Sequence, residues 1–226
     1  MIRLHITAEG QTEQAFAEKI LLPHLALFDV FVDARCVLTS SDKRTAKEFR
    51  GGLSSYEKAK RDIQGWLTED NHTECRFSTM FDLYALPSDF PGYDTAQKNQ
   101  NPYERVKIIE TAMTLDINDQ RFISYIQLHE FEALILADPQ KLTLEYMDHD
   151  AQINNLIAMV GEQNPESIND GPMTAPSKRI LKEIPIYDKA TGGIKVAERI
   201  GLTTLRAKCK HFDDWVTRLE QLGAPA

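Results

Sequence analysis

Short β-rich segments alternate with longer amphipathic segments through the first half of the chain. The amphipathic segments carry apolar residues at helical spacing and are predicted to be helices at residues 12–28, 53–67 and 102–115. The β-rich segments are predicted to be strands at residues 3–8, 30–38, 77–84 and 122–128. Strands that alternate with helices, several of them apolar on both faces, indicate a mainly parallel sheet covered on both sides. We therefore predict an α/β fold with a four-stranded sheet flanked by helices.

The pattern changes after His129, where Pro and Gly separate short helical pieces. These pieces are predicted at residues 130–137, 151–160, 177–183, 194–200 and 213–222. We expect residues 1–137 to form the α/β core and residues 138–226 to form a C-terminal helical extension. The extension is expected to pack on the core, so that the chain makes one structural unit.

Composition places the chain among ordinary globular proteins. It has 226 residues, of which 42% are hydrophobic and 27% are charged. It has no apolar run of about 18 residues and no signal-peptide pattern at its start, so we expect neither export nor membrane insertion. Cys36, Cys75 and Cys209 are widely spaced and are expected to be reduced thiols in the cytoplasm. A structural zinc site is not expected.

Charge is unevenly distributed along the chain. The net charge of -8 argues against non-specific coating of nucleic acid, which depends on neutralisation of phosphates by Lys and Arg. Among the charged residues at 178–210, Lys and Arg nevertheless outnumber Asp and Glu. This stretch either faces an anion or is a solvated helical surface that happens to be basic. Lys178, Arg179 and Lys182 are the candidate phosphate-binding residues within it, because a helix start predicted at Ser177 would add backbone amides.

Acidic residues stand where the first and third predicted strands end. Glu9 follows the first strand beside Gly10, and Glu13 lies four residues later. Glu13 is also explained by the helix dipole, which favours an acidic residue in the first turn of a helix. Asp82 ends the apolar run 78–81 near the end of the third strand, and Asp89 follows in a loop where it is equally explained as a turn residue.

The fourth predicted strand is followed by His129, Glu130 and Glu132. Glu130 and Glu132 fall on different faces of the chain, and only one of them needs to point at the strand ends. Glu130 is the predicted ligand. His129 is a candidate base or a residue that positions a ligand, although a histidine that only satisfies a local hydrogen bond explains the position as well.

The carboxyl ends of parallel strands meet at one edge of a sheet, so these carboxylates are expected to gather there. Two carboxylates about 4 Å apart repel each other by about 4 kcal/mol at an effective dielectric of about 20. A bound cation would relieve that repulsion. Oxygen ligands select Mg²⁺, Mn²⁺ or Ca²⁺ over zinc, and a substrate phosphate commonly completes the shell of Mg²⁺. The pattern therefore predicts Mg²⁺ or Mn²⁺ as cofactor and phosphodiester transfer as the reaction class.

Several motifs together resemble a bacterial family of unknown function numbered 4276. They are EGQTE at 9–13, FDLY at 81–84, DFPG at 89–92, QLHEFEAL at 127–134, APSKRI at 175–180 and HFDDW at 211–215. That family in turn looks like Toprim domains, as in the overcoming-lysogenization-defect nucleases. The resemblance implies a Toprim-like nuclease and, through association with an ATPase partner, a place in phage defence or DNA processing. Tyr84 departs from the pattern, because the usual Asp-x-Asp is Asp82-Leu83-Tyr84 here.

The sequence thus predicts metal-dependent hydrolysis of DNA or RNA, with Glu9, Asp82 and Glu130 as catalytic residues. Glu9, Glu13, Asp82, Asp89 and Glu130 are the predicted metal ligands. Two other functions fit the same residues. One is a catalytically silent Toprim-like module that binds an ATPase or nucleic acid, which the missing Asp-x-Asp favours. The other is a hydrolase of a small phosphorylated molecule.

Overall fold

A parallel sheet forms the centre of the molecule. The computed structural model describes residues 1–42, 47–50, 52–84, 86–168, 171 and 173–223, so residues 169–170, 172 and 224–226 of the predicted extension lie outside it. The sheet contains β1 (Ile2–Ala8), β2 (Val30–Cys36), β5 (Cys75–Asp82), β6 (Phe122–Ile123) and β7 (Ile126–Gln127). Its order is β2-β1-β5-β6, with β7 also paired to β5, and all of these pairs are parallel. The predicted α/β class and four-stranded parallel sheet are confirmed.

The predicted fourth strand is divided in two. Tyr125 N–H donates to Thr79 Oγ1 at 2.9 Å, and the Thr79 hydroxyl donates to the Tyr125 carbonyl at 2.8 Å. Between β6 and β7, the Thr79 side chain thus replaces the backbone hydrogen bonds that would join this segment to β5. Since a side-chain hydroxyl competes with the ladder only where the neighbouring strand brings it close, periodicity could not predict the break.

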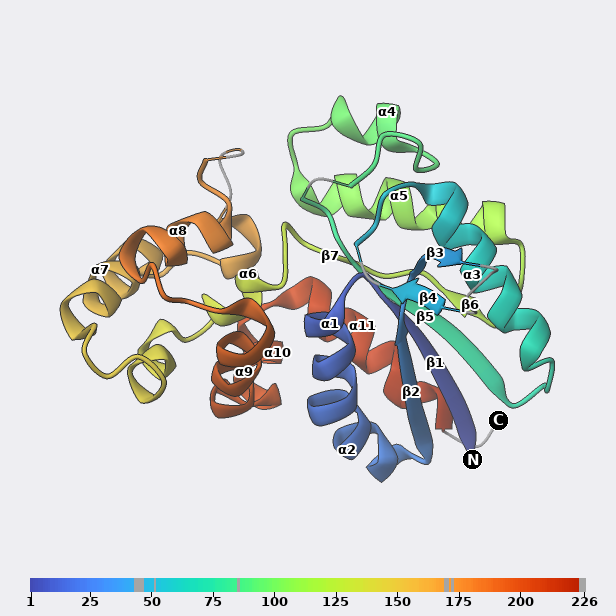
Figure 1. The fold of residues 1–226 in the computed structure, drawn as a ribbon, viewed down its shortest axis with the longest axis horizontal. Coiled ribbons are helices and arrows are strands. Elements are labelled where there is room, and N and C mark those ends of the chain that lie inside the picture. The colour runs from blue at the N-terminus through green and yellow to red at the C-terminus, as the bar shows by residue number, and fades with distance from the viewer. Residues whose placement is uncertain (43–46, 51, 85, 169–170, 172, 224–226) are drawn as a thin grey trace.

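Helices cover both faces of the sheet (Figure 1). One face carries α1 (Gln11–Phe16), the π-helical η1 (Ala17–Leu21), α2 (Leu22–Leu25), the 3-10 turn η2 (Ala26–Phe28), and the C-terminal α11 (Lys210–Glu220) and η6 (Gln221–Gly223). The other face carries α3 (Tyr56–Glu69) and α5 (Pro102–Ile117), with the short α4 (Tyr93–Gln97) beside α5. Each face has its own apolar core.

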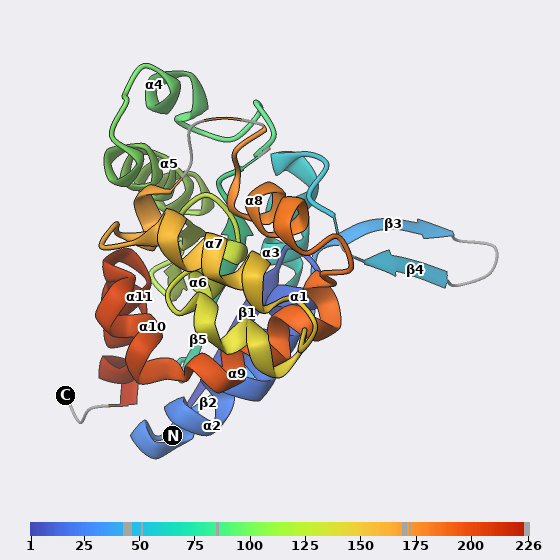
Figure 2. The ribbon, with the colours of Figure 1, turned by 90° about the vertical axis from the view of Figure 1, so that its left-hand side faces the viewer.

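An antiparallel hairpin was not predicted. It is formed by β3 (Leu38–Asp42) and β4 (Lys47–Arg50) after the end of β2. Figure 2 shows the hairpin projecting away from the rest of the molecule. The hairpin sequence is polar and has no apolar face to bury, so hydrophobic periodicity gives no signal for it.

The C-terminal half forms a helical lobe beside the carboxyl ends of the strands (Figure 1). Its elements are α6 (Glu132–Ile135), η3 (Pro139–Leu144), α7 (Asp150–Val160), η4 (Pro165–Ser167), α8 (Pro176–Glu183), η5 (Lys189–Gly193), α9 (Ile194–Ile200) and α10 (Leu202–Lys208). The last helix, α11, returns to the sheet. Trp215 Nε1–H donates to Ser78 Oγ at 3.0 Å, and the Trp215 ring stacks on Tyr125 with centroids 4.0 Å apart.

No helix in the described part of the chain has the length and apolar character needed to cross a bilayer.

Candidate metal centre

Glu9 connects the ends of two adjacent strands. Its backbone continues the sheet, because Glu9 N–H donates to the Met80 carbonyl at 3.0 Å. Its side chain reaches across to β5, where Glu9 Oε2 accepts the Asp82 N–H at 3.0 Å. The first strand therefore ends by placing a carboxylate directly at the end of β5. This is the position that the parallel-sheet argument predicted.

Glu13 caps the first turn of α1 and also contacts Lys189. Its Oε2 accepts the Gly10 N–H at 3.0 Å, which closes the first turn of α1. Its Oε1 lies 3.2 Å from Lys189 Nζ, and the side chain is buried. The helix-start residue is therefore also a member of the acidic group above the strand ends.

Asp82, Glu130 and Glu132 complete this group. All three are buried. Glu130 accepts the Ser177 N–H at 2.6 Å, so the group lies against the start of α8. Glu132 faces the Tyr187 hydroxyl at 3.5 Å. We use the name carboxylate cluster for Glu9, Glu13, Asp82, Glu130 and Glu132.

Lys189 brings an ammonium group into the carboxylate cluster. Its Nζ lies 3.1 Å from Asp82 Oδ2, 3.2 Å from Glu13 Oε1 and 3.6 Å from Glu132 Oε2. The Lys189 side chain is 35% exposed, whereas the three carboxylates that it contacts are buried. Lys189 thus pairs with three of the five carboxyl groups of the cluster.

Close packing of two glycines fixes the segment that carries Lys189. A Cβ at Gly192 would overlap the Tyr146 hydroxyl, and a Cβ at Gly193 would lie 2.6 Å from the Tyr187 hydroxyl. Asp188 accepts the backbone N–H groups of Ala190 and Thr191, which caps η5. The Gly-Gly pair is therefore required by close approach of aromatic side chains, and the result is a fixed position for Lys189.

Burial and mutual repulsion shift the protonation of the carboxylate cluster. Burial, followed by repulsion from Glu13 and Glu130, raises the pKa of Glu9 to about 7. Burial and repulsion from Glu130 likewise raise the pKa of Glu132 to about 7. Burial is also the main reason why the pKa of Asp82 lies well above its usual value. Without a second cation, the cluster retains protons near neutral pH.

Lys189 shows the opposite balance. Burial disfavours its charge, but attraction to Asp82, Glu13 and Glu132 outweighs burial and raises the pKa of Lys189. The ammonium is therefore charged at neutral pH.

The donor set fits a hard divalent cation. Asp82 Oδ1 is buried and accepts no hydrogen bond from the described residues. Such an unpaired acceptor is costly unless a cation or water binds it. The cluster offers only carboxylate oxygens, which suit Mg²⁺ and Mn²⁺.

The other predicted residues lie outside the carboxylate cluster. Asp89 receives the Tyr56 N–H on both carboxylate oxygens at 2.9 Å, so it caps α3. His129 has a left-handed backbone with φ of 62°, and its carbonyl accepts the Tyr84 N–H at 2.6 Å. Lys178 and Lys182 are exposed on α8, and Arg179 Nε donates to the Thr174 carbonyl at 2.6 Å.

Sequence reasoning missed two members of this site. The sequence pattern requires only one of Glu130 and Glu132 at the strand ends, yet the turn into α6 buries both. In the sequence, Lys189 is one of several basic residues between 178 and 210. The signal that could have identified it is the Asp188 to Gly193 segment, where a capping residue and a Gly-Gly pair surround a single lysine.

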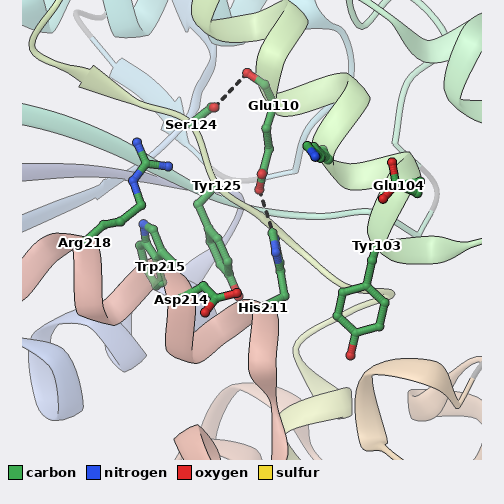
Figure 3. Close-up of a pocket in the computed structure, with 10 residues that line it drawn as sticks. Tyr103, Glu104, Glu110, Ser124, Tyr125, His211, Asp214, Trp215 and Arg218 are labelled. Carbon is green, nitrogen blue, oxygen red and sulfur yellow. Dashed lines mark hydrogen bonds and ion pairs between the residues drawn. The ribbon is translucent and has the colours of Figure 1, made fainter.

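A separate pocket of about 270 Å³ lies between α5 and α11 (Figure 3). Its wall includes His211, whose Nε2 lies 3.0 Å from Glu110 Oε1, and the Tyr125 ring stacked beside it. None of the residues that line this pocket belongs to the carboxylate cluster. The pocket is therefore distinct from the carboxylate cluster.

The chain is similar to one protein family and to solved structures. A family model described as "Domain of unknown function (DUF4276)" matches residues 8–220. The C-terminal region of the Burkholderia pseudomallei OLD protein is similar at 16% identity and a TM-score of 0.48, covering 99% of this chain and 100% of that one. The C-terminal region of the Xanthomonas campestris pv. campestris OLD protein is similar at 14% identity and a TM-score of 0.41, covering 96% and 98%. No curated protein matches the chain.

Proposed function

This chain belongs to the DUF4276 family, and we propose that it hydrolyses phosphodiester bonds of nucleic acid at the carboxylate cluster with the help of Mg²⁺ or Mn²⁺. The observation that carries the proposal is the position of Lys189. Its ammonium lies within 3.6 Å of Glu13, Asp82 and Glu132, at the solvent-facing side of a buried acidic group. The buried carboxylates can bind a divalent metal ion, and the partly exposed ammonium of Lys189 can bind an anionic substrate.

Glu9, Glu13 and Asp82 are the residues proposed to hold the metal, with Glu130 and Glu132 beside them. A bound divalent ion would supply a water of lowered pKa and neutralise charge on phosphate oxygens. Glu132, with a pKa of about 7, lies beside these ligands and can exchange protons near neutral pH. It is proposed to accept the proton of the attacking water. Lys189 is proposed to donate a hydrogen bond to the phosphate once the carboxylates turn toward the metal.

The start of α8 is the proposed contact with the nucleic-acid backbone. The Ser177 N–H binds Glu130, so Lys178 lies within one helical turn of the carboxylate cluster. Lys178 and Lys182 are four residues apart, on the same face of the helix, and both are exposed. This geometry supports the phosphate-binding interpretation of the basic segment over a purely solvated surface.

Two observations favour the silent module instead. Lys189 already neutralises part of the cluster, and Tyr84 stands where a second strand-end carboxylate would be expected. A module of this kind would keep the cluster as a structural ion-pair network. It would bind an ATPase or nucleic acid without cleaving it.

Cleavage of labelled nucleic acid separates these functions. Single- and double-stranded DNA and RNA are incubated with the protein in Mg²⁺, Mn²⁺ or EDTA. We expect metal-dependent cleavage by the wild type and its loss in Glu9→Gln and Asp82→Asn. Asp89→Asn is the matched control, since Asp89 caps α3 outside the cluster and should leave cleavage intact. No cleavage by a wild type that binds Mn²⁺ would favour the silent module, and equal cleavage by all variants would indicate a contaminating nuclease.

A further inference from the structure

Three metal-ligating side chains converge at the opposite end of the sheet from the carboxylate cluster. Cys75 begins β5, and Arg3 of β1 lies beside it in register. His5 is two residues further along β1 and therefore points to the same face of the sheet as Arg3. Asp70 follows the end of α3. The ligand atoms of His5, Asp70 and Cys75 all lie within 4.8 Å of one another.

The contacts within this group are those of an organised site. His5 Nε2 lies 3.0 Å from Asp70 Oδ2. His5 and Cys75 are buried, and Asp70 is only partly exposed. His5 Nδ1 is buried without a hydrogen bond from the described residues, and Asp33 Oδ2 lies 3.6 Å from it. A carboxylate on the far nitrogen is the usual way to orient a metal-binding imidazole.

We propose that His5, Asp70 and Cys75 bind Zn²⁺ or a similar transition-metal ion. A nitrogen, an oxygen and a sulfur ligand select such an ion over Mg²⁺, and three protein ligands leave a fourth position for water. The bound ion joins β1, the α3–β5 connection and β5, so its effect is on stability. This inference goes beyond the proposed function and does not depend on it.

Arg3 supplies the positive charge of the group in the structure. Its Nη2 lies 2.8 Å from Asp70 Oδ1 and 3.1 Å from Cys75 Sγ. The Arg3 side chain is 45% exposed, so it can turn into solvent and leave the ligands to the metal. The guanidinium and the metal thus compete for the Asp70 and Cys75 side chains. Removing the guanidinium should strengthen metal binding.

Protonation of Cys75 should make metal binding depend on pH. Burial, followed by the neighbouring Asp70, raises the pKa of the Cys75 thiol. Metal binding requires the thiolate, so binding must release a proton and become stronger as pH rises.

Titration with Co²⁺ tests the site, because a cobalt–thiolate bond gives a charge-transfer absorption band. Metal-free wild-type protein should develop this band at about one equivalent of Co²⁺, and Zn²⁺ should abolish it. Cys75→Ser should lose the band, and Arg3→Gln should bind Co²⁺ at least about tenfold more tightly, since a charge-assisted hydrogen bond no longer competes. Cys209→Ala is the matched control and should retain the band, because Cys209 is buried elsewhere in the core.

Three results would overturn the proposal. They are no band in the wild type, a band that persists in Cys75→Ser, and a band that appears only after Arg3 is removed. His5→Asn provides a second variant if Cys75→Ser does not fold, and it should weaken Co²⁺ binding while the Cys209→Ala protein behaves as the wild type.

Discussion

Lys189 Nζ lies 3.1 Å from Asp82 Oδ2, although 107 residues separate the two in the chain. The contact joins the helical lobe to the end of a central strand of the sheet. It places the ammonium among carboxylates that the core provides. The site is therefore shared between the α/β core and the helical lobe.

Replacing Lys189 by Met should destabilise the metal-free protein by about 3–5 kcal/mol, because Asp82, Glu13 and Glu132 remain buried without their cation. Chemical denaturation in EDTA measures the effect. Lys195→Met is the matched control. Lys195 forms an exposed ion pair with Glu145 at 2.7 Å, and losing such a pair costs about 0–1 kcal/mol. Equal effects of the two substitutions would show that the cluster does not need Lys189.

Stability in EDTA should decrease as the pH rises from about 5 to about 8. The pKa values of Glu9 and Glu132 rise from 4.5 to about 7 on folding, so the folded chain binds more protons than the unfolded chain in this range. Raising the pH then favours unfolding by at most about 1.4 kcal/mol per pH unit for each group. Denaturation of the Glu9→Gln/Glu132→Gln double variant should show a flatter dependence. The same dependence in the double variant would contradict the assignment.

Gly192→Ala should destabilise the fold by about 1–3 kcal/mol, because the new Cβ overlaps the Tyr146 hydroxyl. Thermal denaturation of Gly65→Ala provides the control. Gly65 lies inside α3, where the nearest atom to an added Cβ is 3.9 Å away, so that change should stabilise the helix by about 0.5–1 kcal/mol. Tyr146→Phe should recover part of the loss in the Gly192→Ala protein. A Gly192→Ala variant as stable as the wild type would mean that η5 can shift freely.

Lys178→Ala/Lys182→Ala should weaken binding of duplex DNA uniformly across sequences, since backbone contacts carry no base information. The log-log salt dependence should flatten by about 1.8, because each lost phosphate contact removes about 0.9. Binding is measured at several salt concentrations in Ca²⁺. Lys210→Ala is the control, since Lys210 pairs with Asp214 on α11. An unchanged slope in the double variant would remove α8 from the binding surface.

Hydrophobic periodicity predicted the parallel sheet and most of its helices because these elements bury continuous apolar faces. It predicted α9 at its observed bounds, Ile194–Ile200. It did not predict the β3–β4 hairpin, which lacks such a face, or the break between β6 and β7, which depends on Thr79.

Some residues of the candidate site could be predicted from the sequence and others could not. Glu9 and Asp82 could be predicted to meet because the ends of adjacent parallel strands must meet. Lys189 could not, since its position depends on how the helical lobe packs and on the approach of Tyr146 to Gly192. Asp89 was predicted to belong to the site but lies outside the carboxylate cluster. Its loop follows β5, but the side chain turns to the N-terminus of α3, a choice that spacing alone does not determine.

Calorimetric titration of Mn²⁺ into the metal-free protein tests most directly whether the carboxylate cluster is a metal centre. A Cys75→Ser background removes the second proposed site from the measurement. We predict saturable binding in this background and unchanged affinity on adding Asp89→Asn. Adding Asp82→Asn should weaken binding by more than the about 10–100-fold typical of residues outside the ligand shell. Absence of binding, or equal affinity with Asp82 and with Asn at this position, would show that the cluster is not a metal centre.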